Sequence, residues 1–414
     1  MNQTVMFFVF FVSIFTLFGL MQYRLYRLVR LWSRSVYEGD ILQRRLNWLK
    51  RSLLLVNALF LLQFVVRGTE WYQEPFLQVF LLYPMGLFFA FVVLSSLLVT
   101  CADVIRLLFF AGDRMFRWVL RSSPAGKQTP ELKPVDPSRR RFLKLGGLSA
   151  AAAAGAIPVV ASLATARDYV INRLDLHFEN FPAALDGLTI AHVSDIHSGI
   201  FMSEQNMREI FELVNSLRPQ LIMVTGDFVD TSDAQIESIY KATEMLKADH
   251  GLFGCLGNHD HFATASKVSA AMEQRGMFML NNGHQKLILE NRELTIVGID
   301  DAGRGRANFA RLDQAVENVC PESFKIMLTH RPDMWDTVRS YGADLTLAGH
   351  THGGQVGFRL GPLNLNPVYL VHKYAMGHFE AEGKHLYVNV GVGMVGVPIR
   401  MVKPEVALLT LHSA

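Results

Sequence analysis

Cysteine is scarce in this chain of 414 residues, which excludes a fold built on disulfide bonds. Three cysteines occur, at Cys101, Cys255 and Cys320, and their wide spacing forms no disulfide framework. Cys255 and Cys320 could pair only if the fold brought them together. Two unpaired core thiols are therefore the simpler expectation.

Net charge is also low, because 40 Lys and Arg residues stand against 37 Asp and Glu residues, for a formal net charge of +3. This balance lacks the basic footprint of proteins that bind nucleic acid, so no nucleic-acid partner is expected. The chain shows no internal repeat of solenoid length. What it does have is apolar residues, half of the total, concentrated in long runs within residues 1–165.

Four of these apolar runs are interpreted as membrane-spanning helices. Residues 4–22 are uncharged and about one bilayer in length. Residues 52–66 are shorter and need flanking residues to cross, whereas residues 76–100 are long enough and tolerate Pro84 inside a helix bundle. Residues 145–165 are less hydrophobic but uncharged, and we interpret them as the fourth span.

The charges of the connecting loops orient these spans. Residues 23–51 carry eight Lys or Arg and two acidic residues, and residues 101–144 carry ten and four. Residues 67–75 carry one Arg and two Glu. Because cytoplasmic loops are rich in Lys and Arg, both basic loops are expected in the cytoplasm. The chain after residue 165 is then expected on the periplasmic side of a bacterial inner membrane.

A short basic motif, SRRRFLK at 138–144, directly precedes the fourth apolar run and resembles the twin-arginine export signal. This signal sends folded, often metal-loaded domains across a bacterial inner membrane, which gives the same topology. Its place inside the chain departs from the usual N-terminal one, so a plain basic stop at the membrane face is the alternative. The sequence ATA at 164–166 resembles a cleavage site, so the fourth segment is either removed or retained.

From about residue 177, short β-type runs alternate with amphipathic stretches. Helices are predicted at 203–217, with Ser203 as the cap, and at 232–247. Strands are predicted at 188–195, 221–227, 294–299, 324–329, 344–348, 385–390 and 405–411, and residues 251–260 are predicted as a strand followed by a loop. This alternation predicts an α/β layered fold. Strands dominate the last third, which favours a β-sandwich flanked by helices.

Polar residues gather where five of these predicted strands end. They are Asp195 and His197 in SDIH, Asp227 in GDFVD, Asn258 and His259 in GNHD, His330 in LTHR, and His350 and His352 in GHTH. Ligands of open α/β sheets bind outside the carboxyl ends of the strands. Each residue alone is compatible with a turn, a cap or a satisfied core position. Five successive strand ends of this kind jointly indicate a metal site.

The ordered set D-x-H, G-D-x-x-D, G-N-H-D, a lone H and G-H-x-H resembles the calcineurin-like metallophosphoesterase superfamily over roughly residues 188–360. The sequences THGGQ and LYVNVGVGMVGVPIR resemble a bacterial membrane-associated phosphodiesterase branch. The resemblance implies the metallophosphoesterase fold, a layered β-sandwich flanked by helices. With the apolar runs and the polar linker, it gives a transmembrane region at 1–121, a cytoplasmic linker at 122–144, a fourth transmembrane or signal-like helix at 145–166 and a catalytic domain at 177–414.

The resemblance also implies a centre of two divalent metal ions. Asp195, His197 and His352 would hold the first ion, Asn258, His330 and His350 the second, and Asp227 would bridge both. Mixed imidazole, carboxylate and amide ligands suit Mn, Fe, Co or Zn. Two such ions would activate a bridging hydroxide for attack on a phosphate ester.

Four further residues receive roles near this centre. His259 would face the substrate without binding metal, and Asp260 would hydrogen-bond to it and orient it. Arg331 and Arg400 are candidates for binding a substrate phosphate, and a surface ion pair is the alternative for Arg331.

These features predict a membrane-anchored, metal-dependent phosphodiesterase or phosphohydrolase. A narrower version acts on lipid-linked substrates at the bilayer surface, as a lipid-directed pyrophosphatase or phosphodiesterase. The alternative from another class is a non-catalytic metal-binding scaffold of the transmembrane bundle. A broken ligand set would favour the scaffold, and the ligand set here is complete.

Overall fold

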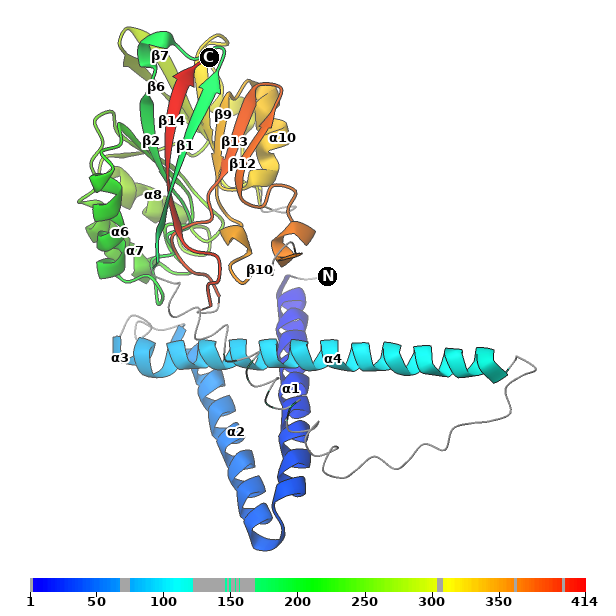
Figure 1. Ribbon diagram of the computed structural model, residues 1–414. Coiled ribbons are helices and arrows are strands. Elements are labelled where there is room, and N and C mark those ends of the chain that lie inside the picture. The colour runs from blue at the N-terminus through cyan, green and yellow to red at the C-terminus, as the bar shows by residue number, and fades with distance from the viewer. Residues whose placement is uncertain are drawn as a thin grey trace. The chain divides into compact units, whose positions relative to one another are not determined.

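A computed structural model describes most of the chain and divides it into two compact units, a helical unit and an α/β unit (Figure 1). The described residues are 3–67, 75–121, 146, 149, 153, 156, 168–303, 308–360, 363–396 and 399–414.

Three long helices form the helical unit: α1 (Gln3–Val36), α2 (Gly39–Arg67) and α4 (Tyr83–Arg121). A short helix α3 (Pro75–Leu77) and a π-helical turn η2 (Gln78–Leu82) precede α4. Phe18 is buried where the three helices meet, with its ring 4.9 Å from those of Phe60 and Phe89. Gln22 and Asn57 exchange side-chain hydrogen bonds of 3.0 and 2.8 Å, which pairs polar groups between α1 and α2.

Among the described residues, one stretch, Phe80–Trp118, is long and apolar enough to cross a membrane. The predicted spans at 4–22 and 52–66 fall within α1 and α2, and the span at 76–100 falls within the helices from α3 to α4. The four-span topology therefore stays a prediction. Three predictions fall outside the described residues, apart from isolated positions: the linker at 122–137, the motif at 138–144 and the fourth span at 145–166.

Two six-stranded mixed sheets build the α/β unit, in the orders β1-β14-β2-β3-β4-β5 and β12-β13-β9-β8-β7-β6. The first contains β1 (Val170–Phe178), β2 (Leu188–Val193), β3 (Leu221–Thr225), β4 (Leu252–Cys255), β5 (Met277–Met279) and β14 (Glu405–Ser413). The second contains β6 (Gly283–Leu289), β7 (Arg292–Gly298), β8 (Phe324–Leu328), β9 (Leu345–Ala348), β12 (Gly377–Ala381) and β13 (Lys384–Val388). A separate hairpin joins β10 (Phe358–Leu360) to β11 (Leu363–Leu365).

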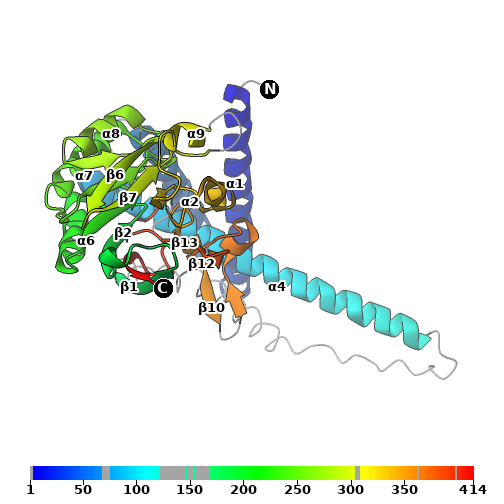
Figure 2. The same cartoon turned by 90° about the horizontal axis from the view of Figure 1, so that it is seen from above.

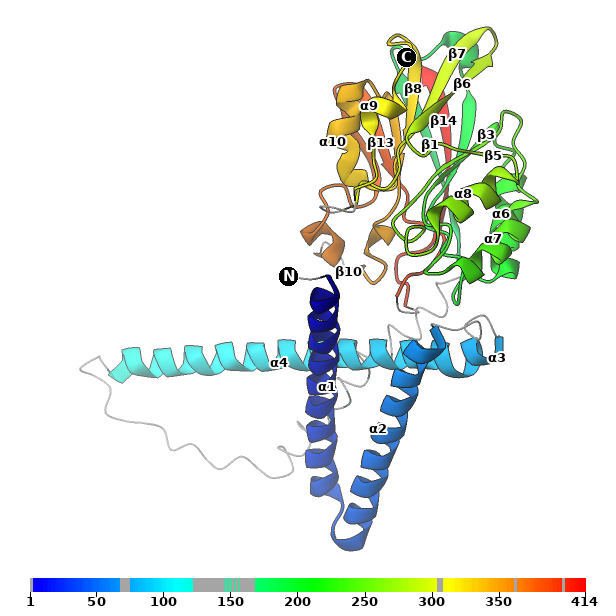
Figure 3. The same ribbon diagram turned by 180° about the vertical axis from the view of Figure 1, so that it is seen from behind.

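Helices cover the outer faces of both sheets. Figure 3 shows α6 (Glu204–Ser216), α7 (Ile236–Thr243) and α8 (Ala265–Glu273) on one side and α9 (Leu312–Ala315) and α10 (Trp335–Val338) on the other. Short 3-10 turns η3 (Ala183–Leu185), η4 (Asp233–Gln235), η6 (Pro332–Met334), η7 (Arg339–Tyr341), η8 (His352–Gly354) and η9 (Pro367–Leu370) lie in the connections. The α6 backbone begins where Ser203 accepts the Asn206 N–H, as predicted.

The apolar core consists of three clusters, one between the two sheets and one between each sheet and its helices. A β-sandwich flanked by helices requires this arrangement. Ile190 and Leu409 of the first sheet share a buried cluster with Ile326 and Leu345 of the second. A second cluster joins α6, α7 and α8 to the first sheet, and a third joins α9 and α10 to the second. The prediction of an α/β layered β-sandwich flanked by helices is thereby confirmed for the α/β unit.

The fold begins earlier than the predicted domain start at residue 177, because β1 begins at Val170. β1 pairs in parallel with β14, so the first and last strands lie side by side, as the view in Figure 2 shows. Most β1 side chains are exposed or half-buried. Its apolar residues Leu174, Leu176 and Phe178 alternate with Asp175 and His177, so the strand pattern was present in the sequence before residue 177.

The three cysteines are free. Cys255 is buried at the end of β4 in the core between the sheets, and Cys320 is partly buried. Cys101 is exposed on α4. The expectation of unpaired thiols is confirmed.

Candidate metal centre

Five strand ends meet at one edge of the sandwich. β2, β3 and β4 run parallel in the first sheet, and β8 and β9 run parallel in the second, so each group presents its carboxyl ends together. The two groups are joined where His330 Nδ1, after β8, donates to the Thr225 carbonyl at the end of β3 over 2.8 Å. The loops that follow these five strands carry all seven predicted metal ligands.

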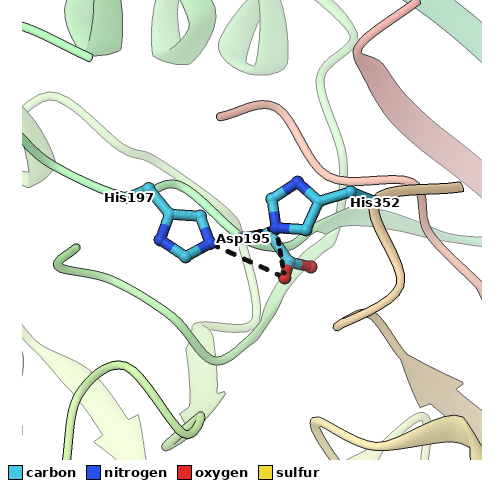
Figure 4. A group of neighbouring side chains, drawn as sticks. All are labelled: Asp195, His197 and His352. Carbon is cyan, nitrogen blue, oxygen red and sulfur yellow. Dashed lines mark hydrogen bonds and ion pairs between the residues drawn. The ribbon is translucent and has the colours of Figure 1, made fainter. Parts of the chain in front are cut away.

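Asp195, His197 and His352 form the first ligand group (Figure 4). The Nε2 atoms of His197 and His352 lie 3.0 Å apart, and they lie 3.9 and 3.3 Å from Asp195 Oδ1. All three side chains are buried. Two facing ring nitrogens and a carboxylate oxygen are electron-rich atoms that a divalent cation satisfies together, so the donor set fits a metal ion.

His330 is the centre of the second ligand group. Its Nε2 lies 3.1 Å from Asn258 Oδ1, 3.2 Å from Asp227 Oδ2 and 3.1 Å from His350 Nδ1. The hydrogen bond from Nδ1 to Thr225 fixes the ring so that Nε2 faces these atoms. Burial lowers the pKa of His330, but the neighbouring Asp227 raises it to about 10 overall. The four side chains thus converge on one point, where they would bind a cation.

Asp227 is shared by the two groups. Its Oδ2 lies 3.4 Å from His197 Nε2 and 3.2 Å from His330 Nε2, while Oδ1 accepts the His259 N–H over 2.8 Å. Burial raises the pKa of Asp227, but His330 and His197 outweigh it and hold the pKa well below its usual value. Asp227 is therefore a carboxylate within reach of both ligand groups.

The backbone around the centre is strained and crowded. Five predicted ligands have left-handed backbone angles: Asp195 (φ 52°), His197 (φ 50°), Asp227 (φ 55°), His350 (φ 70°) and His352 (φ 50°). Such angles at residues other than glycine cost about 1–3 kcal/mol each and gather at functional sites. At Gly257 a Cβ atom would lie 2.5 Å from the Asp227 nitrogen. Glycine at this position lets the loops after β3 and β4 approach each other.

His259 lies beside the first ligand group, with its ring edge-on to that of His197 at 4.6 Å between centroids. Its Nδ1 donates to the Asp230 carbonyl over 2.5 Å and lies 3.6 Å from Asp230 Oδ1. The side chain stays partly exposed, at 17%. A partly exposed imidazole held by a carbonyl and a carboxylate has the geometry of a proton donor to a bound substrate.

Asp260 does not make the predicted contact with His259. It is fully buried and accepts the backbone N–H groups of Asp227 (2.9 Å), Val229 (3.1 Å) and Gly257 (2.9 Å). Burial and the nearby Asp227 carboxylate raise the pKa of Asp260 to about 7. Because three N–H donors occupy its oxygens, Asp260 joins the loops after β3 and β4, and Asp230 is the acidic residue that contacts His259.

Comparison with known proteins agrees with this geometry. Residues 188–354 match the family described as calcineurin-like phosphoesterase. The chain is 31% identical over 287 residues to the uncharacterized metallophosphoesterase YkuE of Bacillus subtilis, covering 67% of this chain and 98% of that relative. The chain belongs to the calcineurin-like phosphoesterase family. Membership supports hydrolase activity, and the clustered Asp and His side chains are compatible with divalent metals.

Two other relatives show how the similarity is distributed. A transmembrane protein with a metallophosphoesterase domain from Danio rerio is 26% identical over 58% of this chain, which spans 57% of that relative. Among solved structures, a dimetal phosphatase from Danio rerio aligns with a TM-score of 0.33 and 12% identity, covering 50% of this chain and 88% of that chain.

Arg331 borders the candidate metal centre. Its Nε donates to Asp301 Oδ1 over 2.7 Å, and its Nη1 lies 2.9 Å from His350 Nε2. Sequence analysis missed Asp301, although it follows β7 as the other acidic residues follow their strands. The same signal, a polar residue at the end of a strand, would have found it.

Arg400, predicted to bind substrate, is a buried structural residue in this fold. The side chain has no exposed area, and its described hydrogen bonds go to main-chain carbonyls. Its acceptors are Val402 (2.9 Å), Val390 (2.6 Å), Gly391 (2.7 Å) and Gly393. A substrate contact would require the guanidinium to leave these carbonyls, which contradicts the predicted substrate role.

Replacing Arg400 by methionine tests this reading. An unsatisfied buried carbonyl costs about 1–3 kcal/mol, so Arg400→Met is expected to lower the free energy of unfolding by about 3 kcal/mol or more. Chemical denaturation measures this loss, and the KM of the folded fraction should stay unchanged. Arg339→Met is the control, because Arg339 makes surface ion pairs with Asp336 and Glu382 that contribute about 1 kcal/mol or less. Unchanged stability with a raised KM would return Arg400 to the substrate site.

Proposed function

We propose that this chain is a metal-dependent phosphodiesterase or phosphohydrolase with a two-metal centre. The observation that carries the proposal is the position of Asp227, whose Oδ2 lies within 3.4 Å of both ligand groups. The first ion would be held by Asp195, His197, His352 and Asp227, and the second by Asn258, His330, His350 and Asp227. When bound, two ions of Mn, Fe, Zn or Co would activate a water molecule and neutralise the phosphate charge.

The side chains at the rim supply the rest of the reaction. His259 Nδ1 is occupied by Asp230, so a proton on Nε2 is the one that can pass to the leaving oxygen. The Asp230 carboxylate lies 3.6 Å from Nδ1, on the side of the ring away from Nε2. Arg331 is held at the rim by Asp301, where a guanidinium can pair with a phosphate oxygen.

We also propose that the chain is anchored in a bacterial inner membrane by several helices, with the phosphoesterase unit on the periplasmic side. The apolar stretch Phe80–Trp118 supports anchoring. The excess of Lys and Arg in residues 23–51 and 101–144, segments that include parts of α1, α2 and α4, supports this orientation. The substrate would be a phosphate ester, with a lipid-linked diester or pyrophosphate as the narrower version. The complete ligand set favours an enzyme over a metal-binding scaffold.

Metal removal tests the catalytic proposal. The full chain, purified in detergent, is expected to hydrolyse an aryl phosphodiester, to lose this activity on chelation and to regain it when Mn²⁺ is returned. Metal analysis of the active sample should find two ions per chain. An aryl monoester assayed beside the diester reports the preference between them. Turnover that persists in chelated, metal-free protein would contradict the proposal.

A further inference from the structure

Three consecutive apolar side chains stand out from the α/β unit at the end of η9. Leu370 is 89% exposed, Val371 64% and Tyr369 48%. A contiguous exposed patch of aromatic and aliphatic residues marks an interaction surface, whereas single exposed apolar residues are ordinary. We call Tyr369, Leu370 and Val371 the apolar tip.

The apolar tip is fixed to the metal loop. Asn366 accepts the Val368 N–H over 3.1 Å and donates to the Gly353 carbonyl over 2.6 Å. Val368 is buried, which seats the turn on the domain. After the tip, the His372 ring packs edge-on against His350 at 5.6 Å between centroids. These contacts therefore attach the tip directly to the loop that carries the predicted ligands His350 and His352.

The strand order places the metal centre at the end of the sandwich where the chain enters it. β1 is parallel to β14 and β14 is antiparallel to β2, so β1 starts at the end where β2 finishes. Asn172 lies opposite Ala407, which lies opposite His192. With neighbouring strands about 4.8 Å apart, the start of β1 is about 10 Å across the sheet from the end of β2.

A membrane is the surface that such a tip would meet. The predicted fourth span ends at residue 165 and β1 begins at Val170, a separation of roughly 15–20 Å at full extension. A connection of this length from the predicted span would bring the metal end of the domain toward the bilayer. Phe262, 64% exposed with its ring 4.9 Å from that of His259, adds a further apolar side chain at this end.

We propose that the apolar tip docks the α/β unit onto the leaflet of the membrane that faces it. Leu370 and Val371 would enter the acyl boundary and Tyr369 would lie at the headgroup level, where tyrosine is enriched. Lys373, exposed two residues after the tip, can reach lipid phosphates beyond its ion pair with Asp336. Docking would hold the metal centre at the level of lipid phosphate groups. The proposal rests on membrane attachment of the chain.

A nitroxide label at position 370 tests the docking without measuring turnover. Leu370→Cys is made in the full chain with Cys101→Ser and Cys320→Ser, since Cys255 is fully buried. The labelled protein is reconstituted into phosphatidylcholine–phosphatidylglycerol vesicles. Electron paramagnetic resonance then compares collisions of the label with oxygen, which concentrates in the bilayer, and with a water-soluble nickel complex.

Ile288→Cys in the same background is the matched control. Ile288 is 65% exposed, and its pairing with Glu293 near the start of β7 places it at the end opposite the metal centre. We expect oxygen to dominate at position 370 and the nickel complex to dominate at position 288. Flotation of the same samples with the vesicles reports attachment, and hydrolysis of a soluble diester reports the catalytic proposal separately.

Two results in a floating sample would overturn the docking. Nickel accessibility at position 370 equal to that at position 288 would show a tip in water. Protection of position 370 from both reagents would show that protein, such as a second copy, covers the tip. A chain that fails to float would overturn attachment and docking together, while diester hydrolysis in that sample would leave the catalytic proposal standing.

Discussion

Asp227→Asn is expected to lower kcat for an aryl phosphodiester by about 10³-fold or more in the metal-loaded full chain. Asp227 Oδ2 lies 3.4 Å from His197 Nε2 and 3.2 Å from His330 Nε2, so one side chain serves both ligand groups. An amide has nearly the same shape but lacks the negative charge that offsets repulsion between two cations. Steady-state kinetics with metal analysis on the same sample measures the effect.

The metal count separates a lost bridge from a lost fold. We expect the variant to retain fewer ions per chain while its thermal unfolding in chelator matches that of the unsubstituted protein. Asp175→Asn is the matched control, because Asp175 lies on β1 with its side chain 70% exposed. Full activity and full metal content in Asp227→Asn would rule out the shared-carboxylate centre.

His259→Ala is expected to slow hydrolysis by about 10²–10⁴-fold for esters with a poor leaving group, and less for aryl esters. A leaving oxygen of high pKa needs a proton as the bond breaks, and the ring held by Asp230 can donate one. A nitrophenolate leaves without this help. A plot of kcat against the pKa of the leaving group should therefore be steeper for the variant.

Metal content decides between the two roles that the geometry allows His259. His197, Asp230 and His259 also lie close enough together to hold a metal ion. We expect His259→Ala to keep its metals, because it is an acid and not a ligand. His261→Ala is the control, since His261 bonds to Asp300 over 2.8 Å and stacks on Phe309. Loss of metal, or an equal loss for all leaving groups, would make His259 a ligand or a structural residue.

The sequence predicted the sandwich and the place of the site because both depend on local patterns. Buried strands such as β3 (Leu221–Thr225) appear in the sequence as apolar runs. The residues that follow them, such as Asp227, lie where parallel strands end together. Edge strands were missed for the opposite reason. β6 and β12 contain no fully buried side chain, so they lack the continuous apolar run that marks a central strand.

The contacts of individual side chains, such as those of Asp260 and Arg400, could not be predicted from the sequence in the same way. Asp260 follows His259 directly in the motif, yet three N–H groups hold its carboxylate and Asp230 contacts the imidazole instead. Arg400 was predicted to bind a substrate phosphate, and only the folded loops show the ring of carbonyls around it. Such contacts arise between segments that lie far apart in the sequence, so spacing alone does not reveal them.

The parallel pairing of β1 with β14 sets a limit on how the chain can be shortened. A fragment that starts at residue 177 would lose nearly all of β1 and leave β14 as the border of the sheet. β14 is mostly buried and apolar, and its newly bare N–H and C=O groups would recruit strands from other molecules. The protein would then aggregate for a reason unrelated to its metals or its membrane. A fragment that starts at residue 168 keeps β14 covered by β1, whose side chains are mostly exposed or half-buried.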